Sequence, residues 1–192
     1  MFPLFETICI VKQQVQNIAL HQQRYEKSVA EFYGGYVEKS INLVEIIDKN
    51  KRIYSEINSD IIRCRIDYNK EHYQIQFFPY QRKNYRTFQP VICDDIDYHL
   101  KFSHRAIFEQ LLQQKQGCDE IIIIKQGNVT DCSIGNLIFR KNNQWMTSNT
   151  PLLKGTQRQK LLAEGKIQER RILLEDLPYF DEVRVINALN GL

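Results

Sequence analysis

Three stretches in the first half of the 192-residue chain place apolar residues at roughly every second position. They cover residues 5–10, 61–68 and 73–78, and such alternation is typical of strands with one buried face. The polar residues 69–71 predict that the last two strands form a hairpin. After the first strand, the chain is expected to turn into a second short strand over residues 15–18.

Apolar residues with helical spacing predict a helix over residues 20–32, which Gly34 and Gly35 end. A second short helix is expected over residues 40–47. Residues 79–97 look irregular and contain two of the five prolines. A domain boundary is therefore expected near the end of this segment, between residues 95 and 96.

The second half is expected to form a mixed sheet with helices. Its predicted elements are a helix over 103–116, a hairpin of 119–124 with a strand from 129 around Gly127, strands over 136–140 and 144–147, a helix over 156–164, a strand over 167–172, a short helix over 174–179 and a buried strand over 182–186. The expected fold class is α+β in two lobes, residues 1–95 and 96–192.

Composition indicates a globular protein, because 43% of the residues are apolar and there are only eight glycines and five prolines. The net charge of +3 is too small to indicate nucleic-acid binding by itself. The longest aliphatic run, residues 121–124, is far shorter than the roughly 18 apolar residues that a membrane span needs. The first residues also lack the basic start of a signal peptide. We therefore expect neither a membrane nor a nucleic-acid partner.

Cysteine and histidine usage favours a reducing compartment without a metal site. The five cysteines are odd in number and widely spaced, without a C-x-x-C motif, so a cytoplasmic location is expected rather than a disulfide framework. The four histidines form no H-x-x-x-H pair, and no metal is expected.

Lys101 stands between Leu100 and Phe102, directly before a predicted helix and close to the predicted boundary. A lysine partly withdrawn from water at such a place is more easily deprotonated and can act as a nucleophile that forms an imine with an aldehyde. For a lone lysine, however, an exposed position at a helix start is the commoner case.

Asp131 lies in the polar segment 127–136 that follows the predicted hairpin. A carboxylate there can keep a pyridine-type ring nitrogen protonated. The alternative is that the Asp, Ser and Asn residues of this segment cap their own turn, which is their usual role.

Gly155 precedes a predicted helix that begins with Thr156 and Gln157. Glycine lets backbone N–H groups approach a ligand, and the positive end of the helix dipole favours phosphate. The segment lacks the G-x-x-x-x-G-K-[ST] pattern of a P-loop. A threonine at a helix start after a glycine is also common for structural reasons alone.

These three segments together provide what pyridoxal phosphate (PLP) requires: a nucleophilic lysine, a carboxylate for the ring nitrogen and a phosphate site. With the start at residues 3–8, the helix at 21–28 and the ending at 176–189, the chain resembles the class IV aminotransferases, the fold-type IV PLP-dependent enzymes. This family includes branched-chain aminotransferase, D-amino-acid aminotransferase and aminodeoxychorismate lyase. The resemblance spans nearly the whole chain and is strongest over residues 98–192.

The resemblance implies a two-lobed architecture like that of D-amino-acid aminotransferase, with PLP in the cleft between the lobes. It implies that Lys101 is the Schiff-base lysine, which also moves the proton between Cα and the cofactor. Asp131 stands where the family usually has the glutamate that faces the pyridine nitrogen.

The other cofactor-binding residues that the resemblance implies are Arg24, Gly155, Thr156, Gln157 and Asn187. Arg24 matches the phosphate-binding arginine of the family's H-x-x-R-L-x-x-S pattern, although Tyr25 replaces the leucine. Asn187 is the candidate for a phosphate contact that Ala188, which stands where some members have a hydroxyl, cannot make.

The resemblance implies a homodimeric, transaminase-type enzyme that acts on a small amino acid. The alternative is a lyase that releases pyruvate and 4-aminobenzoate from aminodeoxychorismate, because the same residues serve both reactions. The candidate substrate-binding residues are Arg82, Lys83, Tyr85 and Arg86. Arginine can bind a carboxylate through two hydrogen bonds, whereas a solvated basic turn is an equally common role for such a segment.

Two further hypotheses remain open. Residues 80–88 mix basic and aromatic side chains, which suits a non-enzymatic binder of single-stranded nucleic acid, but this hypothesis leaves Lys101 and Asp131 without a role. The second hypothesis is that the chain is a degenerate family member that binds the cofactor without turnover.

Overall fold

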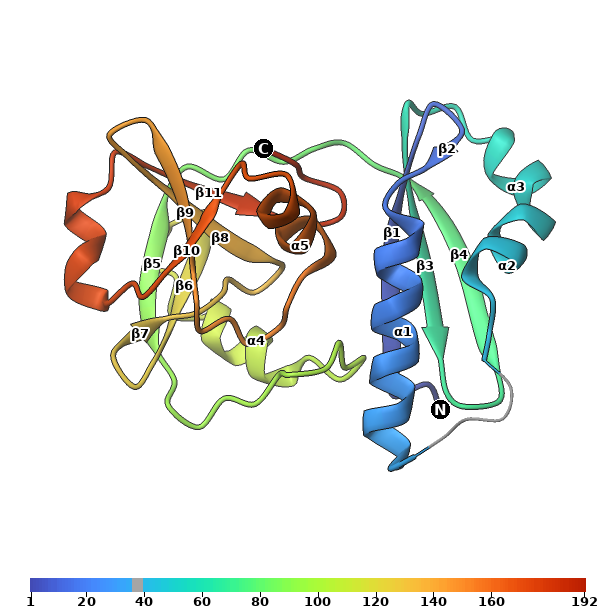
Figure 1. Cartoon of the computed structure of the whole chain (residues 1–192), viewed down its shortest axis with the longest axis horizontal. Coiled ribbons are helices and arrows are strands. Elements are labelled where there is room, and N and C mark those ends of the chain that lie inside the picture. The colour runs from blue at the N-terminus through green and yellow to red at the C-terminus, as the bar shows by residue number, and fades with distance from the viewer. Residues whose placement is uncertain (36–39) are drawn as a thin grey trace. The chain divides into compact units, whose positions relative to one another are not determined.

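The structure is a computed structural model that describes residues 1–35 and 40–192 (Figure 1). The chain divides into two compact units. The first comprises Met1–Arg82 and Leu100–His104, and the second comprises Lys83–His99 and Arg105–Leu192.

A four-stranded antiparallel sheet forms the first unit, with the strand order β2-β1-β3-β4. The strands are β1 (Leu4–Val11), β2 (Gln14–Val15), β3 (Ile61–Tyr68) and β4 (Tyr73–Pro79). The predicted hairpin of β3 and β4 is confirmed by a register that runs from Ile62 opposite Pro79 to Tyr68 opposite Tyr73. Strand β2 is shorter than expected, because the helix that follows begins early.

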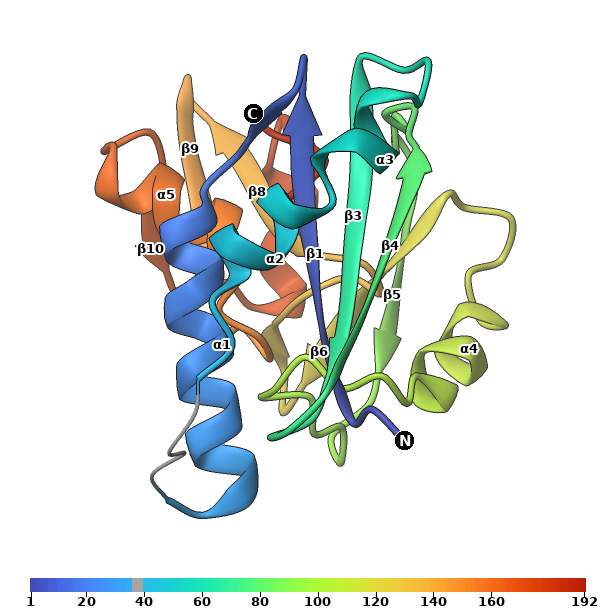
Figure 2. The same ribbon diagram turned by 90° about the vertical axis from the view of Figure 1, so that its right-hand side faces the viewer.

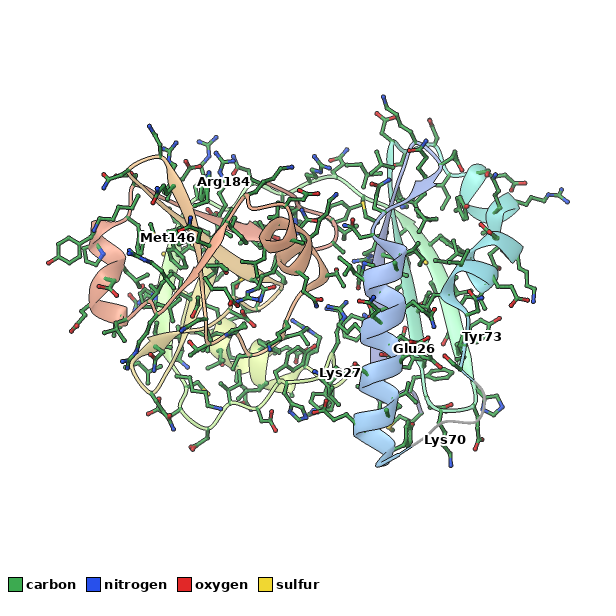
Figure 3. The ribbon with its side chains drawn as sticks, viewed as in Figure 1. Glu26, Lys27, Lys70, Tyr73, Met146 and Arg184 are labelled. Atoms are coloured by element: carbon green, nitrogen blue, oxygen red, sulfur yellow. The ribbon has the colours of Figure 1, made fainter. Side chains whose placement is uncertain are left out.

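Helices α1 (Ile18–Tyr33), α2 (Leu43–Lys49) and α3 (Lys51–Ser55) cover one face of this sheet (Figure 2). Helix α1 buries residues at helical spacing, including Tyr25 and Val29, and it exposes Glu26 and Lys27 (Figure 3). It ends at Gly34 in the left-handed conformation with φ 71°, as the sequence predicted.

The apolar core of the first unit lies between these helices and the sheet. Its fully or nearly fully buried side chains include Leu4, Ile8, Ile10, Tyr25, Leu43, Ile47, Tyr54, Ile62, Ile66 and Tyr68. Since side chains alternate along a strand, the residues between them on β1 and β3 point to the opposite face of the sheet. We call this the helix-free face; it carries Phe5, Thr7, Cys9, Arg63 and Arg65.

The second unit contains two small sheets and three helical segments. Its elements are β5 (Phe88–Ile92), α4 (Ala106–Leu112), β6 (Glu120–Lys125), β7 (Asn128–Val129), β8 (Asn136–Lys141), β9 (Gln144–Ser148), α5 (Thr156–Ala163), β10 (Gln168–Arg170), the 3₁₀ helix η1 (Leu174–Tyr179) and β11 (Glu182–Ile186). The sheet orders are β5-β6-β7 and β10-β9-β8-β11, with parallel pairing of β5 to β6 and of β9 to β10. The expected mixture of helices and strands is therefore confirmed.

Strand β5 lies within the segment that the sequence predicted to be irregular, so that prediction is wrong for residues 88–92. Pro90 weakens the strand signal because it has no N–H to donate. The structure accommodates it at the edge of the sheet, where Pro90 lies opposite Ile122 of β6. Helix α4 is also shorter than the predicted 103–116, and it buries Phe108 and Leu111.

The division between the units differs from the expected boundary between residues 95 and 96. The first compact stretch ends at Arg82, and residues 100–104 return to the first unit. They return because the Phe5 N–H donates to the Lys101 carbonyl at 3.1 Å and the Ser103 N–H donates to the Pro3 carbonyl at 2.8 Å. This segment thereby extends the edge of β1.

Within the described residues, no helix combines the length and the apolar content that crossing a membrane requires. Cys9, Cys64, Cys93, Cys118 and Cys132 are all free of disulfide bonds.

Candidate active site

Lys101 lies in the first unit, in the segment that pairs with the beginning of β1. Its carbonyl accepts the Phe5 N–H, and Leu4 forms a bridge with Phe102, so the backbone on both sides of the lysine is held. The side chain is half-buried, with Nζ 4.6 Å from the centre of the Phe5 ring. The amine of Lys101 thus projects from a segment that is hydrogen-bonded to the edge of β1.

A buried carboxylate, Glu6, lies on the helix-covered side of the same strand. Arg24 on α1 donates to it twice, from Nε to Oε1 at 2.7 Å and from Nη2 to Oε2 at 2.5 Å. His21, one helical turn earlier, places Nδ1 2.6 Å from Oε2. We call Glu6, His21 and Arg24 the buried charge cluster.

The electrostatics of the buried charge cluster favour an ionised Glu6 and a neutral His21. Burial alone raises the pKa of Glu6, but Arg24 and His21 outweigh it and lower the pKa to about 2. Burial lowers the pKa of His21, and the positive charges of Arg24 and Lys101 add to this effect. The neutral ring then donates its Nδ1 hydrogen to Glu6. Lys101 and Arg24, which the sequence predicted to belong to one site, therefore both lie close enough to His21 to influence its pKa.

Asp131 lies in the second unit, on the segment between β7 and β8, and is only 5% exposed. Its Oδ1 accepts the side-chain amide of Asn136 at 2.7 Å, and its Oδ2 accepts the Leu153 N–H at 3.0 Å. Burial raises its pKa to about 6, although these hydrogen bonds and the charge of Arg158 act in the other direction. A buried carboxylate held by neutral donors suits a cationic partner such as a protonated ring nitrogen.

Asn136 connects Asp131 to the beginning of α5. Its Oδ1 accepts the Gly155 N–H at 3.2 Å, and its Nδ2 donates both to Asp131 and to the Leu153 carbonyl. A Cβ atom on Gly155 would lie 2.2 Å from Asn136 Oδ1, so any other residue would displace the Asn136 side chain from its hydrogen bonds. Sequence analysis missed Asn136 as a site residue; an amide directly before the apolar run 137–139 is the signal that could have found it.

The predicted phosphate residues Thr156 and Gln157 form the first turn of α5, and both are buried. The helix has no side-chain cap at its N-terminus, where Gly155 is the capping residue. Such a helix end presents backbone N–H groups and the positive end of its dipole, which is the arrangement that binds phosphate.

Asn187, after β11, uses its side chain to organise its own turn. Its Oδ1 accepts the N–H groups of Leu189 and Asn190, each at 2.9 Å, and its Nδ2 donates to the Ile134 carbonyl at 3.2 Å. The role in phosphate binding stays a prediction. A substitution of Asn187 would remove these three hydrogen bonds and disturb the turn after β11.

The four predicted substrate residues fall in both units. Arg82 ends the first stretch of unit one, whereas Lys83, Tyr85 and Arg86 belong to the second unit. Tyr85 packs against the apolar core of the second unit, and the Arg86 N–H donates to Asp119 at 2.8 Å. The structure therefore does not gather the four side chains within one unit, and their role stays a prediction. On β3, Arg63 and Arg65 occupy alternate positions, so both lie on the helix-free face.

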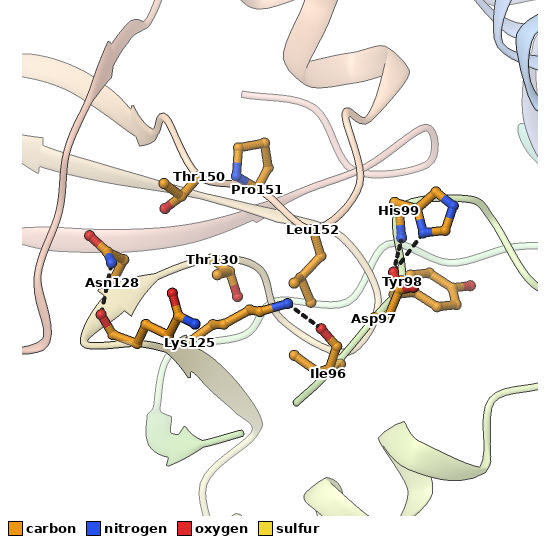
Figure 4. A pocket seen from close by; sticks show the side chains of 11 residues that line it. Ile96, Asp97, Tyr98, His99, Lys125, Asn128, Thr130, Thr150, Pro151 and Leu152 are labelled. Atoms are coloured by element: carbon orange, nitrogen blue, oxygen red, sulfur yellow. Dashed lines mark hydrogen bonds and ion pairs between the residues drawn. The ribbon is translucent and has the colours of Figure 1, made fainter. Parts of the chain in front are cut away.

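The second unit also has a polar pocket of about 290 Å³ (Figure 4). In it, His99 Nδ1 lies 2.6 Å from Asp97 Oδ1, and Lys125 Nζ donates to the Ile96 carbonyl at 2.7 Å. None of the predicted cofactor residues lines this pocket. In the part of the chain that the structure describes, no three His, Cys, Asp or Glu residues come together to hold a metal ion.

Replacing Glu6 by Gln is expected to lower the free energy of unfolding by about 3 kcal/mol at pH 7, because a buried Arg24 would lose its counter-charge. The loss should shrink as the pH falls from 4.5 toward 2, since the low pKa of Glu6 stabilises the native state only while the carboxylate is ionised. Urea denaturation at several pH values measures both effects. The control is Glu45→Gln, which removes an exposed ion pair with Lys49 and should change little. Equal effects of the two variants would contradict the assigned role of Glu6.

For Asp131, the opposite pH dependence is expected. The folded protein binds the proton of this carboxyl more tightly than the unfolded chain does, so the stability from this group is complete below about pH 4 and is lost as the pH rises through 6. Relative to wild type, Asp131→Asn should therefore gain up to about 3 kcal/mol between pH 4 and pH 7. Urea denaturation of the protein without cofactor tests this. With the exposed Asp95→Asn as a control, a pH-independent difference for Asp131→Asn would refute the prediction.

Comparisons with known proteins agree with these observations. Residues 100–192 match the family model described as amino-transferase class IV. A protein of Haemophilus influenzae, described as uncharacterized, is 59% identical over the full length of both chains. A crystal structure from Haemophilus somnus, provisionally described as a 4-amino-4-deoxychorismate lyase, is 57% identical with a TM-score of 0.96, and the match covers 100% of this chain and 98% of that one.

A more distant structure shares the fold alone. This is a protein of Mesorhizobium loti, provisionally described as an amino-acid aminotransferase, which is 20% identical with a TM-score of 0.82 over 100% of this chain and 97% of its own. The resemblance predicted from the sequence is confirmed: the chain belongs to the class IV aminotransferase family and is thereby an enzyme of a PLP-dependent class.

Proposed function

We propose that this protein binds PLP and acts as a class IV aminotransferase-type enzyme that removes the Cα proton of an amino acid. One observation carries this proposal: Asn136 joins a buried carboxylate, Asp131, to the uncapped beginning of α5 through Gly155. A ring nitrogen requires the carboxylate, and a phosphate requires the helix end. These residues fit the cofactor because Asn136 holds the carboxylate in place and Gly155 leaves the helix beginning open.

In this proposal, Lys101 holds the cofactor covalently and Asp131 holds its ring nitrogen. When bound, the cofactor supplies an electron sink for the charge left at Cα after the proton departs. Once the amine of the substrate had replaced that of Lys101 on the cofactor, the freed Lys101 amine would accept that proton and return it. Because the backbone around Lys101 is hydrogen-bonded to β1, only the side chain has to move during this transfer.

The phosphate is assigned to Arg24 and to the backbone N–H groups of Thr156 and Gln157, with Asn187 as a further candidate. Glu6 fixes the plane of the Arg24 guanidinium through two hydrogen bonds. A guanidinium held in this way loses little conformational freedom when it binds an anion.

The arrangement of the two units as lobes around a PLP cleft, a homodimer and a cytoplasmic location are parts of the same proposal. Five cysteines without disulfide bonds support the location. Arg82, Lys83, Tyr85 and Arg86 remain proposed substrate residues.

A lyase is the second candidate, because the full-length relative of Haemophilus somnus has the provisional description 4-amino-4-deoxychorismate lyase. Proton removal from Cα is common to both reactions. They differ in whether the proton returns to the cofactor or a leaving group departs.

Mixing the purified protein with PLP is expected to produce visible absorption that borohydride abolishes by fixing the cofactor to Lys101. After removal of unbound PLP by gel filtration, Lys101→Ala should show neither effect, since no other amine is assigned to the cofactor. Lys49→Ala, a lysine on the exposed side of α2, serves as the matched control and should behave as wild type. Borohydride labelling of a different lysine, located by peptide mass spectrometry, would refute the assignment.

Single-turnover experiments are expected to separate the two reactions. For a transaminase, an added amino acid converts the visible band to that of the amine form of the cofactor and yields a keto acid. For the lyase, amino acids leave the band unchanged, and aminodeoxychorismate yields pyruvate. A protein that binds PLP and does neither is the degenerate family member.

A further inference from the structure

The Phe5 ring of the first unit is in contact with two cations. The Nζ atom of Lys101 is 4.6 Å from the ring centre, and the guanidinium carbon of Arg65 is 4.0 Å from it. The two charges are therefore at most about 9 Å apart, which is comparable to the distance over which physiological salt screens exposed charges. Since Phe5 is buried and Lys101 is half-buried, the screening between these charges is weaker than in water.

Arg65 is held in a fixed position by its own strand. Its Nε and Nη2 donate to the two oxygens of Asp67 at 2.7 Å and 2.6 Å, and this bidentate pair fixes the plane of the guanidinium. Both residues lie on the helix-free face of β3, where Asp67 is opposite Phe5 of β1. Strand β3 is itself hydrogen-bonded to β1 on one side and to β4 on the other, so the backbone of Arg65 is fixed as well.

The carboxylate of Asp67 also reaches the segment that carries Lys101. Ser103 Oγ donates to Asp67 Oδ1 at 3.4 Å, and the Ser103 N–H donates to the Pro3 carbonyl at 2.8 Å. The Lys101 segment is thus connected to β3 by a side chain in addition to its backbone pairing with β1. The positions of Arg65 and Lys101 are therefore set by the same small network.

The charges on the helix-covered side offset one another. Lys101 is in electrostatic reach of His21 in the buried charge cluster. Arg24 and Glu6 of this cluster bind each other and carry opposite charges. The Lys101 segment itself adds His104, whose side chain is exposed to solvent.

Two further arginines of the first unit lie toward the other end of β1. Arg63 is opposite Cys9, four residues beyond Phe5, which corresponds to roughly 13 Å of strand. Arg82 is in electrostatic reach of the same cysteine. Arg65 is thus the arginine that shares an aromatic ring with Lys101.

We propose that Arg65 is a positioning residue whose charge on the Phe5 ring favours the neutral form of the Lys101 amine, an inference that rests on the proposed function. Two cations that share one ring repel each other and compete for its negative face. A guanidinium is not deprotonated in proteins, whereas an ammonium is, so the lysine is the group that gives up its proton to water. The neutral amine is the form that can attack an aldehyde.

The first test titrates Lys101 in the protein without cofactor. Acetic anhydride reacts with neutral amines, so acetylation measured against pH by peptide mass spectrometry gives a midpoint for each lysine separately. In wild type, Lys101 is expected to have a lower midpoint than Lys51, an exposed lysine on α3. Arg65→Gln should raise the midpoint of Lys101 by about one pH unit, and Arg65→Lys, which retains the charge, should change it little.

The variant Asp67→Asn should shift the midpoint of Lys101 in the opposite direction. It breaks the same ion pair as Arg65→Gln, but it leaves the arginine charge unopposed and should therefore lower the midpoint. A merely structural role of the pair would not produce shifts of opposite sign. Arg52→Gln, which breaks an exposed ion pair with Glu56, is the matched control and should leave the midpoint unchanged.

The second test follows the visible band after PLP is added to the protein without cofactor. At pH 7, Arg65→Gln is expected to form the band about tenfold more slowly than wild type, because a smaller fraction of Lys101 is neutral. The difference should shrink as the pH rises to 10, where most of the amine is neutral in both proteins. A difference that stays the same at every pH would contradict the proposal.

Two outcomes of the acetylation experiment would also overturn the proposal. Equal midpoints for Lys101 and Lys51 in wild type would do so even if no variant folds. Shifts of the same sign in Arg65→Gln and Asp67→Asn would do so as well. Failure of wild type to bind PLP would instead refute the proposed function, and the acetylation midpoints would still decide the role of Arg65.

Discussion

The backbone pairing between residues 100–103 and the start of β1 is the constraint on which the candidate site depends. The hydrogen bonds from Phe5 to Lys101 and from Ser103 to Pro3 bring a segment from the middle of the chain back to its first strand. Lys101 thereby stands at the edge of a sheet whose helix-covered face carries Glu6, which meets His21 and Arg24 of α1. Without these backbone hydrogen bonds, the segment that carries Lys101 would have no comparable fixed position relative to these charges.

Two buried carboxylates show how the surroundings, and not burial alone, determine the charge of a group. Glu6 and Asp131 are both withdrawn from solvent, and burial raises the pKa of each. Glu6 has a guanidinium and an imidazole within hydrogen-bond distance, so it stays ionised far below neutral pH. Within the part of the chain that the structure describes, the donors that bind Asp131 are neutral, and it keeps its proton more readily. The first carboxylate is satisfied by the chain itself, whereas the second suits a cationic ligand.

The predictable part of the fold consists of local patterns. Alternation over residues 61–68 and 73–78 predicted β3 and β4, and Gly34 and Gly127 marked real turns with positive φ. Strand β5 was missed because Pro90 breaks the local strand signal, while its pairing with β6 depends on residues 32 positions away. Local propensity contains no information about such a partner.

The sequence by itself determined the family and the strand alternation over residues 61–68, and it led to the proposal of Lys101 and Asp131 as site residues. Only the tertiary structure decided that Glu6 meets Arg24 and that Asn136 links Asp131 to Gly155. The physical reason is that periodicity shows which residues share a face of an element, whereas strand pairing and helix packing decide which buried charges meet.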